Sequence, residues 1–267
     1  MQNVLGFFFR AKSPKVTKKI VRAMDIKLFT LPNMLTLANL LSGAAAIVAV
    51  LCHHSYEMAM WLIIASAVFD FLDGFAARLL GQFSPLGIEL DSLADDISFG
   101  LAPAVVMFDL YNHSSSMYGL AESVTEPAGY VVFIIAAFSA LRLAKFNIDK
   151  RQVGEFIGLP TPANALMLMS LATLAEQGLV TLSQEHILLI SVAAAMLLIS
   201  PIRMFALKFH GFGLRGNEIR FGFLLASLLL IIFLPTYSIV AIIVLYIATS
   251  TIVWLFTPSK EEDEYEY

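Results

Sequence analysis

The chain contains a series of mostly apolar stretches, each close to the length of a helix that crosses a lipid bilayer. Such a helix needs about 20 apolar residues. The candidate stretches lie at 33–53, 58–80, 87–110, 129–147, 162–178, 185–202, 219–234 and 236–256. Composition agrees, because 58% of the 267 residues are hydrophobic and 14% are charged, whereas soluble domains are about 25% charged. The sequence therefore predicts an all-α, polytopic transmembrane helix bundle of about eight spans.

The basic residues predict how this bundle is oriented. If the N-terminus is cytoplasmic, the external connections lie near 54–57, 111–128, 179–184 and 235. None of these connections contains Lys or Arg, and all 17 basic residues then fall on the cytoplasmic side. This is the distribution expected from the positive-inside rule. We expect both the N-terminus and the C-terminus in the cytoplasm.

Two polar segments flank the apolar region and divide the chain into three parts. Residues 1–30 form a basic segment, which we expect to lie on an anionic membrane surface, with a disordered basic tail as the alternative. Residues 31–257 form the transmembrane domain, and 258–267 form an acidic cytoplasmic tail with no assigned role.

Acidic residues are concentrated in the second and third apolar stretches, on either side of the connection between them. Asp70 and Asp73 are three residues apart, and Asp91 and Asp95 are four apart, so each pair shares a helix face. The intervening "LLGQFSP" has the Gly, Ser and Pro typical of a turn. Two antiparallel helices joined there would bring the four carboxylates together near the cytoplasmic side. Glu89 and Asp96 fall on other faces and are left out of this site.

Four clustered carboxylates in a membrane need compensating positive charge. Oxygen ligands without nearby His or Cys suit Mg²⁺ or Mn²⁺, and two such ions would suit a displacement at phosphorus. Gly74 and Gly87 would let a ligand approach the helix backbones, and the planar fork of Arg78 fits a phosphate. The alternative is that the acids are solvated helix ends and that Arg78 is an ordinary cytoplasmic anchor.

The same residues resemble the signature of the CDP-alcohol phosphatidyltransferase family. The matching pattern is Asp70-x-x-Asp73-Gly74-x-x-Ala77-Arg78, then eight residues, Gly87, and Asp91 and Asp95 at intervals of four. Members of this family are integral membrane enzymes with a six-helix core, so the eight stretches would be that core plus two. They displace CMP from a CDP-linked lipid or alcohol by attack of a hydroxyl group. The resemblance implies a phosphotransferase that uses two divalent cations, Mg²⁺ or Mn²⁺.

The resemblance also implies roles for the signature residues. Asp70, Asp73, Asp91 and Asp95 would be metal ligands, and Asp95 would also be the catalytic general base. Gly74, Ala77 and Arg78 match positions that contact the CDP moiety, and Gly87 is assigned to the same CDP-lipid site. In the first stretch, the polar residues Asn33, Thr36 and Asn39 are further candidates for nucleotide contacts. Asn33 or Thr36 could equally be a helix cap or a packing residue.

Other pieces of the chain resemble the bacterial and archaeal family members that use L-serine. They lie at 31–43, 90–104, 140–148 and 156–166. The chain departs from these relatives at Asp96, where an apolar residue is common, and at Lys145, where Arg is common. The resemblance implies transfer of a phosphatidyl group from CDP-diacylglycerol to L-serine in the inner membrane of a prokaryote. It also implies a site that faces the cytoplasm and a homodimer.

Serine carries a carboxylate, for which the sequence offers cationic partners. Arg142 is the first candidate for acceptor binding, with Lys145 and Asn147 behind it, because Arg142 and Lys145 share a helix face. These residues could instead be positive-inside anchors. Other acceptors, glycerol 3-phosphate, inositol or its phosphate, remain an alternative within the family. A cation-coupled transporter that uses the acids as ion ligands is a more remote one. The segment 200–203 is interpreted as a helix end and turn.

Overall fold

The computed structural model describes residues 28–149, 156–205, 213 and 217–256. The predicted basic segment, apart from residues 28–30, and the predicted acidic tail lie outside these residues. The helices in the described residues are α2 (Leu31–His53), α3 (Tyr56–Leu80), α4 (Pro85–Asp95), η1 (Asp96–Leu101), α5 (Ala102–Asn112), α6 (Glu122–Gly129), η2 (Tyr130–Phe133), α7 (Ile134–Ile148), α8 (Thr161–Glu176), α9 (Gln184–Ile199), α10 (Glu218–Phe233), η3 (Pro235–Tyr237) and α11 (Ser238–Phe256). Each of the eight apolar stretches is helical, as predicted.

Four of the helical segments are long and apolar enough to cross a membrane. They are Leu31–His53, Tyr56–Leu80, Glu122–Ile148 and Pro235–Phe256. The helices α8, α9 and α10 have 16 residues each, and the third stretch is divided among α4, η1 and α5. The protein is therefore a helical membrane protein.

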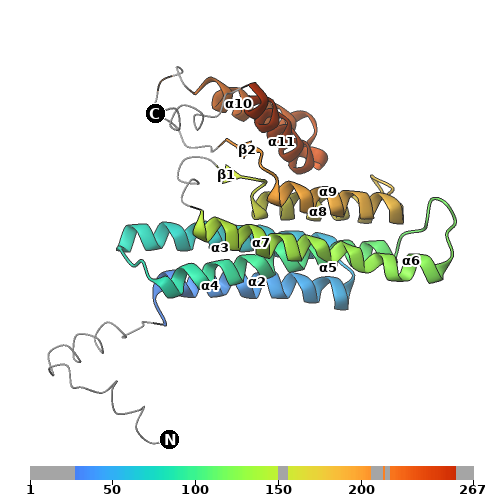
Figure 1. Ribbon diagram of the computed structural model, residues 1–267, viewed down its shortest axis with the longest axis horizontal. Coiled ribbons are helices and arrows are strands. Elements are labelled where there is room, and N and C mark those ends of the chain that lie inside the picture. Colours follow the sequence, from blue (N-terminus) through green and yellow to red (C-terminus); the bar gives the residue numbers. More distant parts are fainter. Residues whose placement is uncertain (1–27, 150–155, 206–212, 214–216, 257–267) are drawn as a thin grey trace, which may run out of the picture.

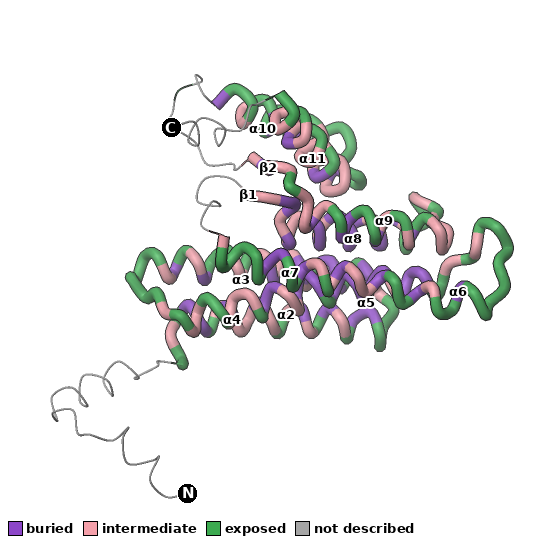
Figure 2. Tube along the Cα trace, in the orientation of Figure 1, coloured by how far each residue is buried: buried purple, intermediate pink, exposed green. Residues whose placement is uncertain are grey.

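The helices form three tiers (Figure 1). The first tier contains α2, α3, α4, α5 and α7, the second contains α8 and α9, and the third contains α10 and α11. The core lies mainly in the first two tiers, where buried residues concentrate (Figure 2). Phe99, Met107, Ile135 and Leu168 are fully buried there.

The turn between α3 and α4 follows from local sequence. Gly81 ends α3 in the left-handed region, with φ 61°, a conformation that glycine adopts without steric cost. Ser84 then caps α4 by accepting a hydrogen bond from the Gly87 N–H at 3.0 Å. Pro85 is the first residue of α4, where its missing N–H costs nothing. The turn predicted at this place is confirmed, and it reverses the chain.

A short antiparallel strand pair departs from the purely helical prediction. Strand β1 (Phe156–Ile157) pairs with β2 (Arg203–Met204), joining the segment before α8 to the segment after α9. The helix end predicted at 200–203 is confirmed, because α9 ends at Ile199 and Ser200 is its C-cap, but the predicted turn is wrong, because the segment leads into strand β2 at Arg203. The third tier is tied to this pair, since the Tyr246 hydroxyl on α11 donates to the carbonyl of Phe205 at 3.0 Å.

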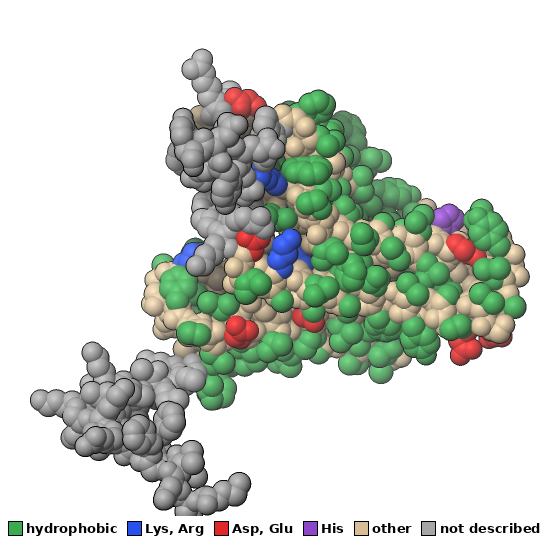
Figure 3. Space-filling model, in the orientation of Figure 1, with side chains coloured by type: hydrophobic (Ala, Val, Ile, Leu, Met, Phe, Trp, Pro, Cys, Tyr) green, Lys and Arg blue, Asp and Glu red, His purple; other side chains and the backbone are tan. Residues whose placement is uncertain are grey.

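The surface is largely hydrophobic along the helices on the face drawn in Figure 3. On this face, Lys and Arg side chains lie toward the end where α3 turns into α4, acidic side chains lie toward both ends, and a His lies at the opposite end.

Candidate active site

Helix α2 holds two of the predicted aspartates through hydrogen bonds. The Thr36 hydroxyl donates to Asp73 Oδ2 on α3 at 2.6 Å, and the Asn39 Nδ2 donates to Asp95 Oδ1 on α4 at 3.0 Å. The orientation of the Asn39 amide is set by Ser66, whose hydroxyl donates to Asn39 Oδ1. All five side chains are buried. Thr36 and Asn39, predicted from the sequence as nucleotide contacts, therefore bond the carboxylates themselves.

Three carboxylates converge between α3 and α4. One oxygen each of Asp70, Asp91 and Asp95 lies within 4.8 Å of the others. Asp91 Oδ1 is buried and has no hydrogen-bond partner. A buried carboxylate oxygen without a partner is costly, and a divalent cation would satisfy it. The group consists of carboxylates alone, so this donor set fits a hard cation such as Mg²⁺ or Mn²⁺.

A cavity of about 190 Å³ opens beside these carboxylates, between α2, α3 and α4. Among its lining residues are most of the predicted ones: Asn33, Thr36, Asp73, Gly74, Ala77, Arg78, Gly87 and Asp91. A Cβ on Gly87 would lie 3.4 Å from Asn33 Oδ1, so a side chain there would enter the space beside Asn33. The Asn33 Nδ2 donates to the Leu28 carbonyl at 2.9 Å.

Two polar residues of the α3–α4 turn also line the cavity, Gln82 and Ser84. The sequence pattern indicates only a turn in this segment. The sequence feature that indicates a role for Gln82 and Ser84 is their position between the two halves of the signature. A turn that joins two ligand-bearing helices lies at the edge of the site that those helices form.

Of the three predicted acceptor residues, only Arg142 is buried. It is 7% exposed, and its Nη1 donates to Thr161 Oγ1 on α8 at 3.4 Å. Its Nε is buried without a partner, and the Asp95 carboxylate is near enough to interact electrostatically with the guanidinium. Lys145 is exposed, so the common face expected for Arg142 and Lys145 does not form one buried pocket. Asn147 is also exposed and donates to Ser92 Oγ on α4 at 2.9 Å.

Asn164 on α8 is a candidate that sequence reasoning missed. It is fully buried, and neither its Nδ2 nor its Oδ1 has a hydrogen-bond partner. It is three residues after Thr161, the partner of Arg142, and therefore lies on the same side of α8. The signal was a polar residue within an apolar helix, which marks a functional position in a membrane protein.

The helix that carries Asp91 and Asp95 changes its winding directly after Asp95. Residues Asp96–Leu101 form the π-helix η1, and such insertions occur often at functional sites. Gly100 in this segment packs against α7, since a Cβ there would lie 2.8 Å from Ser139 Oγ. Asp96 Oδ1 is buried without a partner, whereas Glu89 is exposed. Neither residue joins the three-carboxylate group.

The fold and the site together define a helical membrane protein with a carboxylate centre inside its bundle. The family model for CDP-alcohol phosphatidyltransferase matches residues 29–256, and the chain belongs to that family. This confirms the resemblance found in the signature residues.

Relatives named "CDP-diacylglycerol--serine O-phosphatidyltransferase" occur in bacteria and archaea. The chain is 32% identical to the protein from Helicobacter pylori over 237 residues, which is 87% of this chain and 94% of the relative. It is 35% identical to the protein from Methanocaldococcus jannaschii, over 66% of this chain and 74% of the relative. It is 33% identical to the protein from Bacillus subtilis, over 53% of this chain and 75% of the relative.

Proposed function

We propose that this protein transfers a phosphatidyl group from CDP-diacylglycerol to L-serine, producing phosphatidylserine and CMP. The observation that carries the proposal is the pairing of a carboxylate cluster with a buried arginine, Arg142, whose guanidinium interacts electrostatically with Asp95. The names of the three relatives support the same donor and the same acceptor.

The donor site is the cavity between α2, α3 and α4. The diphosphate lies against Gly74 and Gly87, where no Cβ intervenes, and Arg78 binds a phosphate oxygen. Asp70, Asp73, Asp91 and Asp95 would hold two divalent cations. When bound, such cations neutralise negative charge on the diphosphate and on the leaving group. Asn33, Thr36 and Ala77 line the nucleotide side of the same cavity.

Asp95 accepts the proton of the serine hydroxyl. The serine oxygen forms its bond to the phosphatidyl phosphorus while the bond from that phosphorus to the CMP oxygen breaks, and the proton passes to the Asp95 carboxylate. A free hydroxyl is a weak nucleophile at neutral pH, so a base within hydrogen-bond reach is required. The hydrogen bond from Asn39 holds Oδ1 of Asp95, which leaves Oδ2 for the substrate.

Arg142 binds the serine carboxylate. Its buried Nε has no partner and its Nη1 has only the long bond to Thr161, so the guanidinium retains donors for an anion. Asn164 supplies further unused polar atoms on α8. Among the residues that the structure describes, this site has one buried guanidinium, which suits a single carboxylate, whereas a phosphorylated acceptor would need a denser basic pocket; Lys145 is exposed. Lys145 and Asn147 then act at the entrance for the acceptor.

We further propose that all eight helical stretches span the inner membrane of a prokaryote, with both termini and the active site on the cytoplasmic side. The absence of Lys and Arg from the external connections supports this orientation. In this orientation, the CDP moiety of the donor lipid and serine reach the site from the cytoplasm, while the acyl chains of the donor lipid stay in the bilayer. The same proposal includes the division of the chain into a basic segment, a transmembrane domain and an acidic tail, with boundaries after residues 30 and 257. It also includes assembly of the protein as a homodimer.

Release of CMP from CDP-diacylglycerol by the purified protein tests the function. We expect release with L-serine and not with glycerol 3-phosphate or inositol, and we expect a chelator of divalent cations to abolish it until Mg²⁺ or Mn²⁺ is returned. Release that is faster with another alcohol would overturn the serine assignment. Full activity after chelation would overturn the role of the aspartates.

A further inference from the structure

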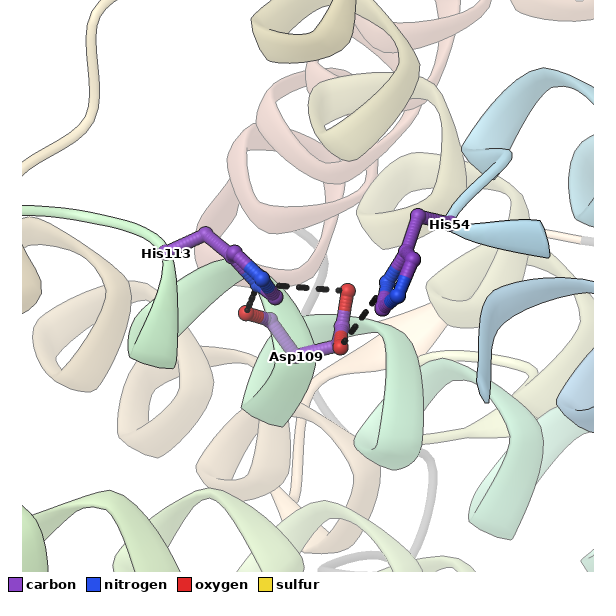
Figure 4. A group of neighbouring side chains, drawn as sticks. All are labelled: His54, Asp109 and His113. Carbon is purple, nitrogen blue, oxygen red and sulfur yellow. Dashed lines mark hydrogen bonds and ion pairs between the residues drawn. The ribbon is translucent and has the colours of Figure 1, made fainter. Parts of the chain in front are cut away.

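A second group of possible metal ligands lies at the other end of the bundle from the aspartates. His54 is the C-cap residue of α2, Asp109 lies in the last turn of α5, and His113 follows α5. Figure 4 shows the two imidazoles on either side of the Asp109 carboxylate. Tyr56, at the start of α3, contacts this group, and Asp70 is 14 residues further along the same helix, which corresponds to about 21 Å.

The three side chains are close enough to share one ion. His54 Nδ1 lies 3.9 Å from Asp109 Oδ1, and His113 Nδ1 lies 3.6 Å from Asp109 Oδ2. One ligand atom from each residue lies within 4.8 Å of the other two. Asp109 is 9% exposed, so its carboxylate is the buried member of the group. The two imidazoles are exposed, and small rotations of their rings would bring their nitrogens to an ion.

Neighbouring groups hold these residues in position. The Tyr56 hydroxyl donates to Asp109 Oδ2 at 2.8 Å, and His113 Nδ1 bonds to the Asp109 carbonyl oxygen at 2.8 Å. A carbonyl oxygen only accepts, so His113 Nδ1 is the donor in this bond, and Nε2, not the Nδ1 whose distance to Asp109 is given above, has the lone pair that would bind the ion. A backbone carbonyl that fixes the tautomer in this way is typical of metal-binding histidines. His54 has φ 49°, an uncommon conformation for a residue other than Gly.

The ligand types differ from those of the aspartate centre. Two imidazole nitrogens and one carboxylate are the donors that Zn²⁺ prefers, whereas an all-carboxylate set suits Mg²⁺. The connections at 54–57 and 111–128 contain no Lys or Arg, and the ion pairs of Asp109 within the described part of the chain are those with His54 and His113.

We propose that His54, Asp109 and His113 form a Zn²⁺ site separate from the carboxylate centre. The ion takes three protein ligands and completes its coordination with water, as zinc sites with three protein ligands do. It links the α2–α3 connection to the end of α5, and so fastens the ends of three helices on this side of the bundle.

Zinc binding to the purified full-length protein tests the proposal, with excess Mg²⁺ present to occupy the aspartates. Competition with a chromophoric chelator gives affinity and stoichiometry. We expect one Zn²⁺ per chain, and an affinity at least about tenfold weaker in His54→Asn and in His113→Gln. Asn is chosen at position 54 because it tolerates the left-handed conformation. Tyr56→Phe, which removes the hydroxyl bonded to Asp109, should weaken binding by about tenfold as well.

The matched control is His53→Asn, because His53 is an exposed imidazole next to His54 and is not part of the group. It should bind Zn²⁺ as the wild type does. Zn²⁺ should also raise the unfolding temperature of the wild type and of His53→Asn, but not that of His54→Asn. Equal affinity in the wild type and His54→Asn, or no binding by the wild type, would overturn the proposal. So would a zinc absorption-edge spectrum with oxygen neighbours only.

Discussion

At the scale of single residues, the hydrogen bonds from α2 decide how the carboxylates are presented. Thr36 and Asn39 each donate to one oxygen of an aspartate on another helix, so the second oxygen of Asp73 and of Asp95 stays available for a cation or a substrate. Side chains locked in this way keep catalytic groups in a productive geometry. Thr36 and Asn39 therefore position the carboxylates, and Thr36 also lines the cavity.

Replacement of Asp95 by Asn tests the general base. The change keeps the size of the side chain and its ability to accept from Asn39, but it removes the carboxylate that takes the proton. Loss of general-base catalysis should lower the rate of CMP release by a factor of about 10² to 10⁴. Glu89→Gln is the control, since Glu89 is exposed and lies outside the carboxylate group. Wild-type activity in Asp95→Asn would contradict the assigned role.

Replacement of Arg142 by Gln tests acceptor binding. Loss of a charge-assisted hydrogen bond of about 1.5–3 kcal/mol should reduce kcat/KM for serine by roughly 10- to 150-fold, and leave KM for CDP-diacylglycerol nearly unchanged. Steady-state kinetics with each substrate varied in turn gives both values. Lys145→Gln is the comparison, and its effect should be much smaller because Lys145 is exposed. An equal loss for both substrates would instead assign Arg142 a structural role.

At the scale of elements, the close approach of α2 to η1 holds the site together. Gly43 on α2 lies against Ser98 of η1, and the Ser98 hydroxyl donates to the Asn39 carbonyl at 3.1 Å. Asn39 thus bonds the π-helix through its backbone carbonyl and Asp95 through its side-chain amide. Small residues at such contacts let membrane helices approach closely.

Replacement of Gly43 by Ala should therefore destabilise the protein. Its Cβ would lie 2.6 Å from the Ser98 Cα, a backbone atom that cannot rotate away. Overpacking of this kind costs about 1–3 kcal/mol, and it should also lower activity by displacing Asn39. Gly222→Ala on α10 is the matched control, because nothing lies within 4 Å of its Cβ. It should leave stability unchanged or raise it by at most about 1 kcal/mol. Thermal unfolding in detergent compares the two variants, and equal stability would contradict the close packing.

At the scale of the whole molecule, the two ends of the bundle differ in chemistry. The aspartates, the cavity and Arg78 lie toward the α3–α4 turn. The other end carries His54, Asp109 and His113. This polarity is what an enzyme needs if a charged substrate reaches it from one side of the membrane only.

Cysteine labelling in intact cells tests the orientation. Cys52 is the single cysteine of the chain, so a Cys52→Ser background makes each new cysteine unique. Gln82→Cys, in the α3–α4 turn, should react with a membrane-impermeant maleimide only after the cells are permeabilised. Tyr118→Cys, in the exposed segment before α6, should react without permeabilisation. The reverse pattern would invert the proposed topology.

The sequence by itself determined the class of the molecule and much of the carboxylate site. Apolar stretches of bilayer length have few stable conformations besides the helix, because the membrane offers their backbone groups no partner. The aspartates could be grouped because their spacing is local, and a helix and a tight turn convert local spacing directly into geometry. Asp70, Asp91 and Asp95 converge accordingly.

Only the tertiary structure decided which residues from distant segments meet that site. Arg142 and Lys145 share a helix face in the sequence, yet Arg142 is buried beside Thr161 and Lys145 is exposed. The bonds of Asn39 to Asp95 and of Tyr56 to Asp109 join segments more than fifty residues apart. The π-helix after Asp95 had no readable pattern either. The reason is physical. The rotation of one helix against another is set by how their side chains pack together, and not by the periodicity of either helix. This packing cannot be derived from the residues of one helix alone.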